Sequence, residues 1–412
     1  MKRFETYLLM ALMVLAGCTK MQLNEEAIPD QEVSFHIARS QTLTKAGGMK
    51  AAEEEFTTFT CKGFLHAEGV NLDETHAPSQ ALGYQDFFGS STTTPAYTEA
   101  VSYTFSDANG NGTKENGEVS WNPAHAYYWP KSPYSYVNFV AWYGTGNGDN
   151  NHPVIGYGWD SASSKYKATL DWAFESAVNQ GEVNLLYADP AWHQKSTTSA
   201  QYGAVSNVSR GVPLLFHHAL AQINVRVITV KAGEEDPNIS VVPGQNKVTD
   251  GTATWTITLA NPKITNIYTT GNLHLEALDS GTENSQGTWS GTGWSGTGSK
   301  GQLAPADFTV REVDFEGAGE MNLIAPTCVM PQTIGADVVL SFDMQIVTEY
   351  ANDVRHQEII GINIKLNDMG TNAWAQNTKY TYNIKINPSQ NSVFFDPVVQ
   401  SEWQTGSSEQ TI

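Results

Sequence analysis

Cysteine is scarce in this chain, and so is positive charge. Three cysteines in 412 residues cannot build the dense disulfide framework of a small secreted fold. The 23 Lys and Arg residues stand against 43 Asp and Glu, which leaves a formal net charge of -20 at pH 7. Because binding to nucleic acid requires a basic surface, this balance excludes a nucleic-acid partner.

Sequence motifs of the common enzyme classes are also missing. The chain has no HExxH, no CxxC pair and no glycine-rich phosphate loop after a strand. The stretch GWSGT at 293–297 departs from the G-x-S-x-G nucleophile elbow at Thr297. His217 and His218 are adjacent, and on a strand they point to opposite faces, which argues against a shared metal. We therefore expect no enzyme, no catalytic residue and no cofactor.

Long hydrophobic runs are absent after the N-terminus. The apolar run at 7–16 follows a basic start and ends in Leu-Ala-Gly-Cys at 15–18, and it is too short to cross a bilayer. This pattern predicts a signal peptide over 1–17 with lipidation of Cys18. The alternative is an ordinary signal with an incidental cysteine. A lipid on Cys18 would anchor the mature protein to a membrane.

The next residues predict a tether, a strand and a cleavable linker. Residues 18–32 are polar, whereas 33–38 (VSFHIA) alternate apolar and polar side chains, as strands do. Residues 39–50 lack apolar periodicity and carry Arg and Lys. An exposed basic linker after a strand is a site where a trypsin-like protease cuts.

Strand patterns dominate the remainder. Aromatic residues reach 11% and charged residues only 16%, which excludes a disordered chain. The alternation predicts strands with one buried and one solvated face, and we find no long amphipathic helix. The clearest alternating sets are Trp255, Ile257 and Leu259; Leu340, Phe342, Met344 and Ile346; and Tyr380, Tyr382, Ile384 and Ile386. The predicted fold class is all-β.

The segment 287–301 contains WSGTG twice in tandem, from Trp289 and from Trp294. Glycine at this density is typical of a mobile loop. The two indoles either stand exposed as platforms for sugar rings or fold back onto the protein, and we favour the second. Cys61 and Cys328 likewise allow two readings, a disulfide or two separate core residues, and we favour separate residues.

The stretch 107–118 (DANGNGTKENGE) fits a calcium-loop pattern. Asp107, Asn109, Asn111 and Glu118 occupy ligand positions of that pattern. An EF-hand loop lies between two helices, however, and strand patterns flank this stretch. The Asn-Gly steps are equally typical of a hairpin turn. We expect the turn, with a weak extracellular-type calcium site as the alternative.

Several stretches in a fixed order resemble one family. They are the Leu-Ala-Gly-Cys end of the signal, the strand and basic linker at 33–50, YYWP at 127–130 before VNFVAWY, NLLYA at 184–188, PLLFHHALAQINVRV at 213–227, LIAPTCVMPQ at 323–332, and Trp374 followed by YTYNIKIN and VFFDPVVQSEW. Together they resemble the fimbrillins, lipoprotein-derived (type V) pilins. The resemblance implies two transthyretin-like β-sandwich domains, which we place at 33–212 and 213–412.

The same resemblance implies a route of assembly. The lipoprotein reaches the outer membrane and the cell surface, and a trypsin-like protease removes the strand 33–38. The cut is expected between Lys45 and Ala46, or otherwise between Arg39 and Ser40. A donor segment at about 391–405 of another fimbrial subunit then fills the groove. Its candidate groove-filling residues are Val393, Phe394, Phe395, Val398 and Val399.

The expected function is that of a structural fimbrial subunit that supports adhesion to a host or glycan ligand. The physics of strand exchange is independent of the family name. Losing one strand exposes an apolar groove and unpaired backbone groups. An extended segment from another chain covers the groove and pairs those backbone groups again. The alternative function is a monomeric cell-surface lipoprotein that binds glycans through Trp289 and Trp294.

Overall fold

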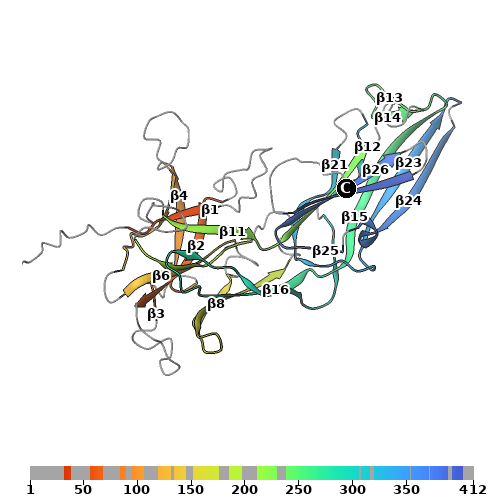
Figure 1. The fold of residues 1–412 in the computed structure, drawn as a ribbon. Coiled ribbons are helices and arrows are strands. Elements are labelled where there is room, and N and C mark those ends of the chain that lie inside the picture. The colour runs from red at the N-terminus through yellow and green to blue at the C-terminus, as the bar shows by residue number, and fades with distance from the viewer. Residues whose placement is uncertain are drawn as a thin grey trace, which may run out of the picture.

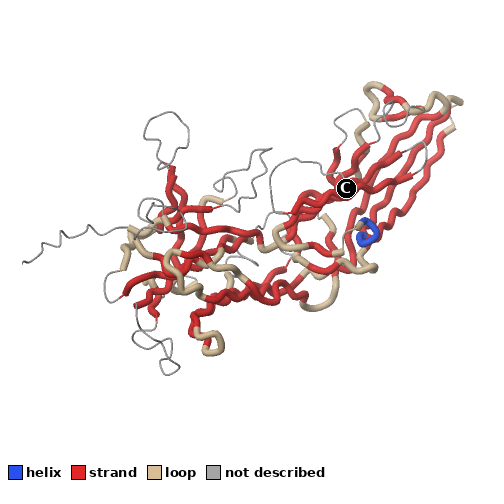
Figure 2. Tube along the Cα trace, in the orientation of Figure 1, coloured by secondary structure: helices blue, strands red, loops and turns tan. Residues whose placement is uncertain are grey.

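The regular secondary structure of the described residues is almost entirely strand, as the alternation predicts (Figure 2). The computed structural model describes residues 32–38, 56–67, 84–89, 95–105, 119–130, 134–144, 152–175, 185–196, 211–229, 238–305, 308–315, 320–352, 354–370, 372–387 and 392–401. The only helical element among these residues is a 3-10 turn, η3 (Leu366–Met369). None of them forms a helix long and apolar enough to cross a membrane.

The strands of the N-terminal part, together with the later β17, form a ten-stranded sheet, seven strands of which close into a ring. Its order is β17-β10-β6-β9-β11-β1-β5-β4-β2-β3, and β6 also pairs with β2. That extra pairing makes a ring of β2, β6, β9, β11, β1, β5 and β4. The strands are β1 (Phe35–Ala38), β2 (Thr58–Ala67), β3 (Tyr84–Asp86), β4 (Thr98–Phe105), β5 (Val119–Pro123), β6 (Tyr134–Tyr143), β9 (Leu186–Ala188), β10 (Ala191–Gln194), β11 (Val212–His218) and β17 (Ser285–Gln286).

One hydrophobic cluster fills this ring. Every strand of the ring contributes to it, because each alternating sequence turns one set of side chains inward. The buried members include Phe35, Phe59, Trp121, Phe139 and Val212. The ring is therefore held by a shared aromatic core as well as by its backbone ladder.

A four-stranded sheet joins early and late parts of the chain. Its order is β18-β16-β8-β7, so β16 and β18 pair with strands that come much earlier in the sequence. The strands are β7 (Val154–Asp160), β8 (Lys165–Glu175), β16 (Thr270–Leu278) and β18 (Ser290–Gly296). A second cluster, with Trp142, Trp172 and Leu273 among its members, lies beneath this sheet. The predicted domain boundary at 212/213 stays a prediction, and these strands hydrogen-bond across it.

The C-terminal part contains two further sheets, which occupy the other end of the molecule (Figure 1). One has the order β21-β12-β26-β27, with β12 (Ala221–Thr229), β21 (Glu320–Val329), β26 (Thr378–Asn387) and β27 (Ser392–Ser401). The other contains β13 (Ser240–Val242), β14 (Lys247–Thr249), β15 (Ala253–Ile267), β19 (Gly301–Leu303), β20 (Arg311–Glu312), β23 (Val339–Tyr350) and β24 (Arg355–Lys365). β22 (Gln332–Thr333) pairs with β25 (Ala373–Trp374).

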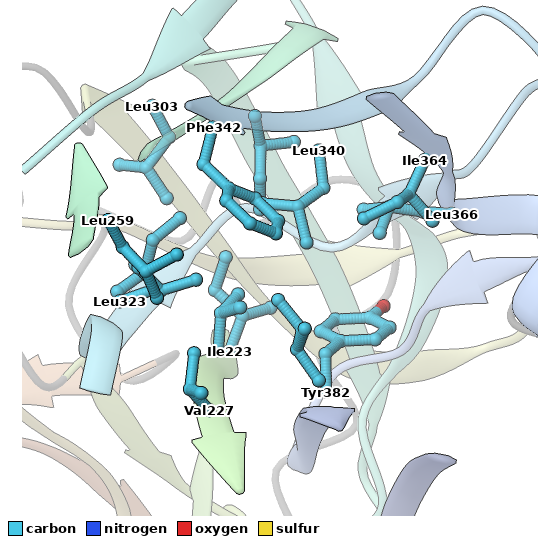
Figure 3. Close-up of a cluster of buried hydrophobic side chains, with 14 of the residues drawn as sticks. Ile223, Val227, Leu259, Leu303, Leu323, Leu340, Phe342, Ile364, Leu366 and Tyr382 are labelled. Carbon is cyan, nitrogen blue, oxygen red and sulfur yellow. The ribbon is translucent and has the colours of Figure 1, made fainter. Parts of the chain in front are cut away.

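These two sheets share one core (Figure 3). Ile223 and Tyr382 come from the first sheet, and Leu259 and Phe342 come from the second. The predicted alternating sets on β23 and β26 are buried throughout, at 5% exposure or less. Trp255 on β15 is only half-buried and packs against the core. The inward face of each strand was thus predicted correctly.

The glycine-rich segment folds back onto the protein. Both of its tryptophans are half-buried. Trp289 donates its Nε1–H to the carbonyl of Ala188 at 2.7 Å, and Trp294 donates to the carbonyl of Ala219 at 2.5 Å. The indoles therefore attach β18 to the rest of the fold, and neither stands free as a platform.

The cysteines Cys61 and Cys328 are free thiols in different hydrophobic clusters. Burial raises the pKa of Cys61 well above its usual value and that of Cys328 to about 12. The interpretation as separate core residues is confirmed, and both thiols are protonated and unreactive in the folded state.

Two buried histidines stay neutral. His66 Nε2 lies 2.6 Å from the Tyr157 hydroxyl, and the Asn138 amide donates to the same hydroxyl at 2.7 Å. Burial lowers the pKa of His66 to about 3, and it lowers that of His218 to about 3 as well. The neighbouring His217 points elsewhere, with Nε2 at 3.0 Å from Asp189 Oδ2.

Candidate functional site

The strand β1 is the candidate functional element, because it closes the N-terminal ring. It runs parallel to β11, with Phe35 opposite Val212 and Ile37 opposite Leu214. On its other side it meets β5, where Phe35 lies opposite Trp121. Figure 1 shows β1 beside β11 at the N-terminal end of the molecule. Without β1, the ring would end in two unpaired edges, one on β11 and one on β5.

Backbone hydrogen bonds extend the contact ahead of the strand. The Val33 N–H donates to the carbonyl of Tyr127 at 2.7 Å, and the Val212 N–H donates to the carbonyl of Ser34 at 2.7 Å. Glu32 and Tyr128 form an isolated antiparallel bridge. The motif YYWP at 127–130 therefore has a structural role, since its backbone receives the residues that enter β1.

Two side chains anchor β1 in the core. Val33 and Phe35 are each 2% exposed, whereas His36 is exposed and Ile37 half-buried. The Phe35 ring meets Phe139 edge-on at 5.2 Å between centroids and Phe59 at 5.8 Å. Each fully buried side chain of this kind stabilises the fold by about 1.5–3 kcal/mol relative to exposure. β1 is thus held mainly by Val33 and Phe35.

Gly211 allows β11 to approach β1 closely. Its φ is +81°, and a Cβ at this position would lie 2.6 Å from the carbonyl carbon of Phe35. Any side chain here would both strain the backbone and collide with β1. Sequence reasoning missed this residue, although the Gly-Val-Pro step at the start of β11 was a usable signal.

A buried carboxylate fixes the segment that receives β1. Glu99 Oε2 accepts a hydrogen bond from the Tyr127 hydroxyl at 2.9 Å, and its Oε1 lies 3.0 Å from His125 Nδ1. Burial and this carboxylate raise the pKa of Tyr127 to about 12. The tyrosine therefore keeps its proton and donates to Glu99, which ties the residue that receives Val33 to β4.

The predicted donor segment forms β27, the last strand of its sheet. β27 pairs antiparallel with β26 from Thr378 opposite Ser401 to Asn387 opposite Ser392. Within this register Val393 lies opposite Ile386, and Phe395 lies opposite Ile384. Among the described residues, β27 has a strand partner on one side only. An edge strand of this kind can leave its sheet without opening the sheet in the middle.

Other predicted positions lie outside the described residues. These are the lipidation site Cys18, the cleavage positions Arg39, Ser40, Lys45 and Ala46, and the calcium-loop residues Asp107, Asn109, Asn111 and Glu118. Among the residues that the structure describes, no group of three or more His, Cys, Asp or Glu side chains could hold a metal ion.

The sequence profile of the family described as fimbrillin-like matches residues 85–401. This chain belongs to the fimbrillin-like family. The resemblance found in the sequence is confirmed. Fimbrillin-like proteins are structural and adhesive components of fimbriae at the cell surface, and they are not enzymes. As a fimbrillin-like protein, the chain is expected to work with other fimbrial subunits.

Solved structures similar to this fimbrillin-like chain include two fimbrial proteins. A fimbrial protein from Bacteroides vulgatus is 13% identical with a TM-score of 0.48, and the alignment covers 90% of this chain and 99% of that one. The tip fimbrial protein Mfa3 from Porphyromonas gingivalis, with C-terminal truncation, is 10% identical with a TM-score of 0.29, covering 90% and 100%. No curated protein sequence matches the chain.

Proposed function

We propose that this fimbrillin-like chain is a fimbrial subunit that is exported as a lipoprotein and assembled by protease-triggered strand exchange. The observation that carries the proposal is the position of β1. It closes a ring, it is only four residues long, and it is attached to the remainder through residues 39–50, where the predicted cuts lie. A cut there would leave β1 held by non-covalent contacts alone.

Loss of β1 would create a site of defined chemistry. The groove would be lined by Trp121, Phe139 and Val212, which now lie beside Phe35 in the same hydrophobic cluster. The β11 edge would lose the partner of the Val212 N–H, and the Tyr127 carbonyl would lose its donor. Exposed apolar surface and unpaired backbone both favour binding of another extended segment.

The donor segment repeats the spacing of the strand that it would replace. In β1 and its approach, Val33 and Phe35 are separated by one residue, and Val393 and Phe395 in β27 are separated in the same way. A strand presents residues two apart to the same face, so the two segments can offer Val and Phe to the same pockets. We propose this register for the exchanged strand.

The exchange replaces one backbone ladder with another. β27 would give up its ladder with β26 and form a new one with β11 and β5 of the next subunit. The gain is burial in the aromatic ring core, where Phe35 lies in the uncut chain. Each subunit would thus use its C-terminal segment on the next ring, and this head-to-tail contact yields a filament rather than a closed oligomer.

The assembly can be tested with a controlled cut. A recognition site for a sequence-specific protease placed within 39–50 should leave the purified chain monomeric before cleavage. Filaments should appear after cleavage, measured by sedimentation and electron microscopy. A chain ending at Asn391 should be cut equally well and form no filaments. If that truncated chain still polymerises, the donor assignment is wrong.

A register-specific variant sharpens this test. Phe395→Asp should abolish filaments after cleavage, because a charge cannot enter the pocket that Phe35 vacates. Phe395→Leu is the matched control and should still assemble. Equal assembly of both variants would contradict the proposed register while leaving the use of the C-terminal segment intact.

The processing route has its own measurement. N-terminal sequencing of the protein extracted from the cell surface should give Ala46, or otherwise Ser40, for subunits in the filament. A lipidated Cys18 as the first residue would mark subunits that keep β1 and act as anchors. A filament composed entirely of uncut chains would contradict protease-triggered exchange.

A further inference from the structure

A bulge in β15 opens a groove on the C-terminal part of the molecule. The pairing between β15 and β23 shifts register between Ala260 and Lys263. Asn261 lies within the bulge at φ +53°, a left-handed conformation that Asn tolerates, and Pro262 follows it. The interruption is one wall of a groove of about 530 Å³, within the range of pockets that bind small molecules.

The groove stays open at its base because Gly361 has no side chain to fill it. Gly361 on β24 lies opposite Asp343 on β23, and a Cβ at Gly361 would meet no atom within 4 Å. Gly361 has no left-handed φ, so the position does not need glycine for backbone reasons. Its lack of a side chain keeps the space above Asp343 open.

The groove is lined by neutral and oppositely charged hydrogen-bonding groups. Asn261 donates its amide to Asp343 Oδ2 at 2.7 Å, which holds both side chains at the wall. Ser341, Asn363 and Lys263 also line the groove. The set combines two amides, a hydroxyl, a carboxylate and an ammonium group, so it offers donors and acceptors without excess charge.

An aromatic ring completes the lining. Phe308 is half-buried, lines the groove and packs against the core of the two C-terminal sheets. The guanidinium of Arg311 lies over this ring at 5.2 Å from its centroid, which fixes the ring in place. The groove thus offers a fixed apolar surface beside a dense polar set.

A peptide cannot bind in this groove by adding a strand to β23. β23 is paired with β15 on one side and with β24 on the other, so its N–H and C=O groups are used in ladders. The ligand must therefore be recognised by side chains. A ligand with many neutral hydroxyl groups and one apolar face matches this lining, and that is the chemistry of a sugar ring.

We propose that the groove beside Asn261, Asp343 and Gly361 binds a saccharide unit. The hydroxyl groups of the sugar donate to the Asp343 carboxylate and accept from the Asn261 and Asn363 amides, while its carbon face rests against Phe308. The site is separate from Trp289 and Trp294. It lies on β15, β23 and β24, at the end of the molecule opposite β1 in Figure 1, and none of these three strands takes part in the proposed exchange.

The test starts with the purified full-length chain on an array of oligosaccharides that end in galactose, N-acetylglucosamine, mannose, fucose or N-acetylneuraminic acid. The strongest binder is then measured by isothermal titration calorimetry. Failure of the wild-type chain to bind any of them overturns the proposal. This result is independent of filament formation, since the measurement uses uncut monomers.

Two variant pairs locate the site. Gly361→Tyr fills the groove from an uncrowded position and should lower affinity at least about 10-fold, whereas Gln357→Tyr on the same exposed strand should change it less than about 2-fold. Asp343→Ala should lower affinity about 10-fold to 100-fold, because it removes the carboxylate that accepts hydrogen bonds from the sugar. Gln345→Ala, two residues along β23 and outside the groove lining, should have little effect.

Thermal unfolding of each variant shows whether it remains folded. A tyrosine at a strand position is compatible with the ladder, so Gly361→Tyr should unfold at or above the wild-type temperature. Unchanged binding by Gly361→Tyr overturns the proposal. Loss of binding in Trp289→Phe or Trp294→Phe, with Gly361→Tyr still binding, would also overturn it and place the sugar at β18.

Discussion

Truncating Phe35 should loosen β1 more than any other change within that strand. The side chain is 2% exposed and meets the Phe59 and Phe139 rings edge-on. Replacing a buried Phe with Ala removes its apolar surface from the core and leaves a cavity, which costs about 3–5 kcal/mol. We therefore expect Phe35→Ala to lower the free energy of unfolding of the uncut chain by that amount.

The measurement is urea unfolding followed by tryptophan fluorescence, because Trp121 lies opposite Phe35 in the ring. His36→Ala is the matched control. His36 is exposed on the same strand, so its truncation removes little buried apolar surface and should lower the free energy of unfolding clearly less than Phe35→Ala does. An unchanged m-value in both variants would show that the difference lies in the stability of the folded state.

Amide hydrogen exchange gives a local readout of the same prediction. The Val212 N–H donates to the Ser34 carbonyl, so it is protected only while β1 stays in place. Phe35→Ala should speed exchange at Val212, and His36→Ala should leave it unchanged. A cost below about 1 kcal/mol for Phe35→Ala, or equal exchange in both variants, would refute the view that the aromatic core retains β1.

Three further predictions concern the backbone, the pH and the thiols. Gly211→Ala should lower the free energy of unfolding by about 1–3 kcal/mol more than Gly244→Ala does. Both glycines have positive φ, but only Gly211 lies against β1. Equal losses of stability in chemical unfolding would contradict this prediction. The free energy of unfolding should fall as pH drops below about 6.5, because His66 and His218 have pKa values of about 3 in the folded state and take up protons on unfolding. Each histidine lowers the free energy of unfolding by up to about 1.4 kcal/mol per pH unit in this range. Constant melting temperatures from pH 7 to pH 5 would refute this prediction. Cys61 and Cys328 should react with a thiol reagent only after unfolding. Rapid labelling of either of these two residues in the native chain, located by peptide mass spectrometry, would contradict this.

Some structural features could be predicted because they depend on neighbours in sequence. The inward faces of β23 and β26 followed from a period of two, as the burial of Phe342 and Tyr382 shows. The strand at 33–38 was predicted for the same reason, through Val33 and Phe35. Alternation fixes which face of a strand is apolar, and it does so before any partner strand is known.

Other features depend on partners that are distant in the chain. No local pattern showed that β16 and β18 would pair with β8, or that Trp289 and Trp294 would donate to the carbonyls of Ala188 and Ala219. The groove beside Gly361 was missed as well, because it exists only where a bulge in β15 meets β23.

The sequence by itself determined the all-β class, the apolar face of each strong strand and membership of the fimbrillin-like family. Only the tertiary structure decided that β1 closes a ring between β11 and β5, and that Gly211 and Phe139 shape the place it occupies. The physical reason is that side-chain periodicity is a local property of the backbone, whereas strand order and core contacts depend on which distant segments exclude water together.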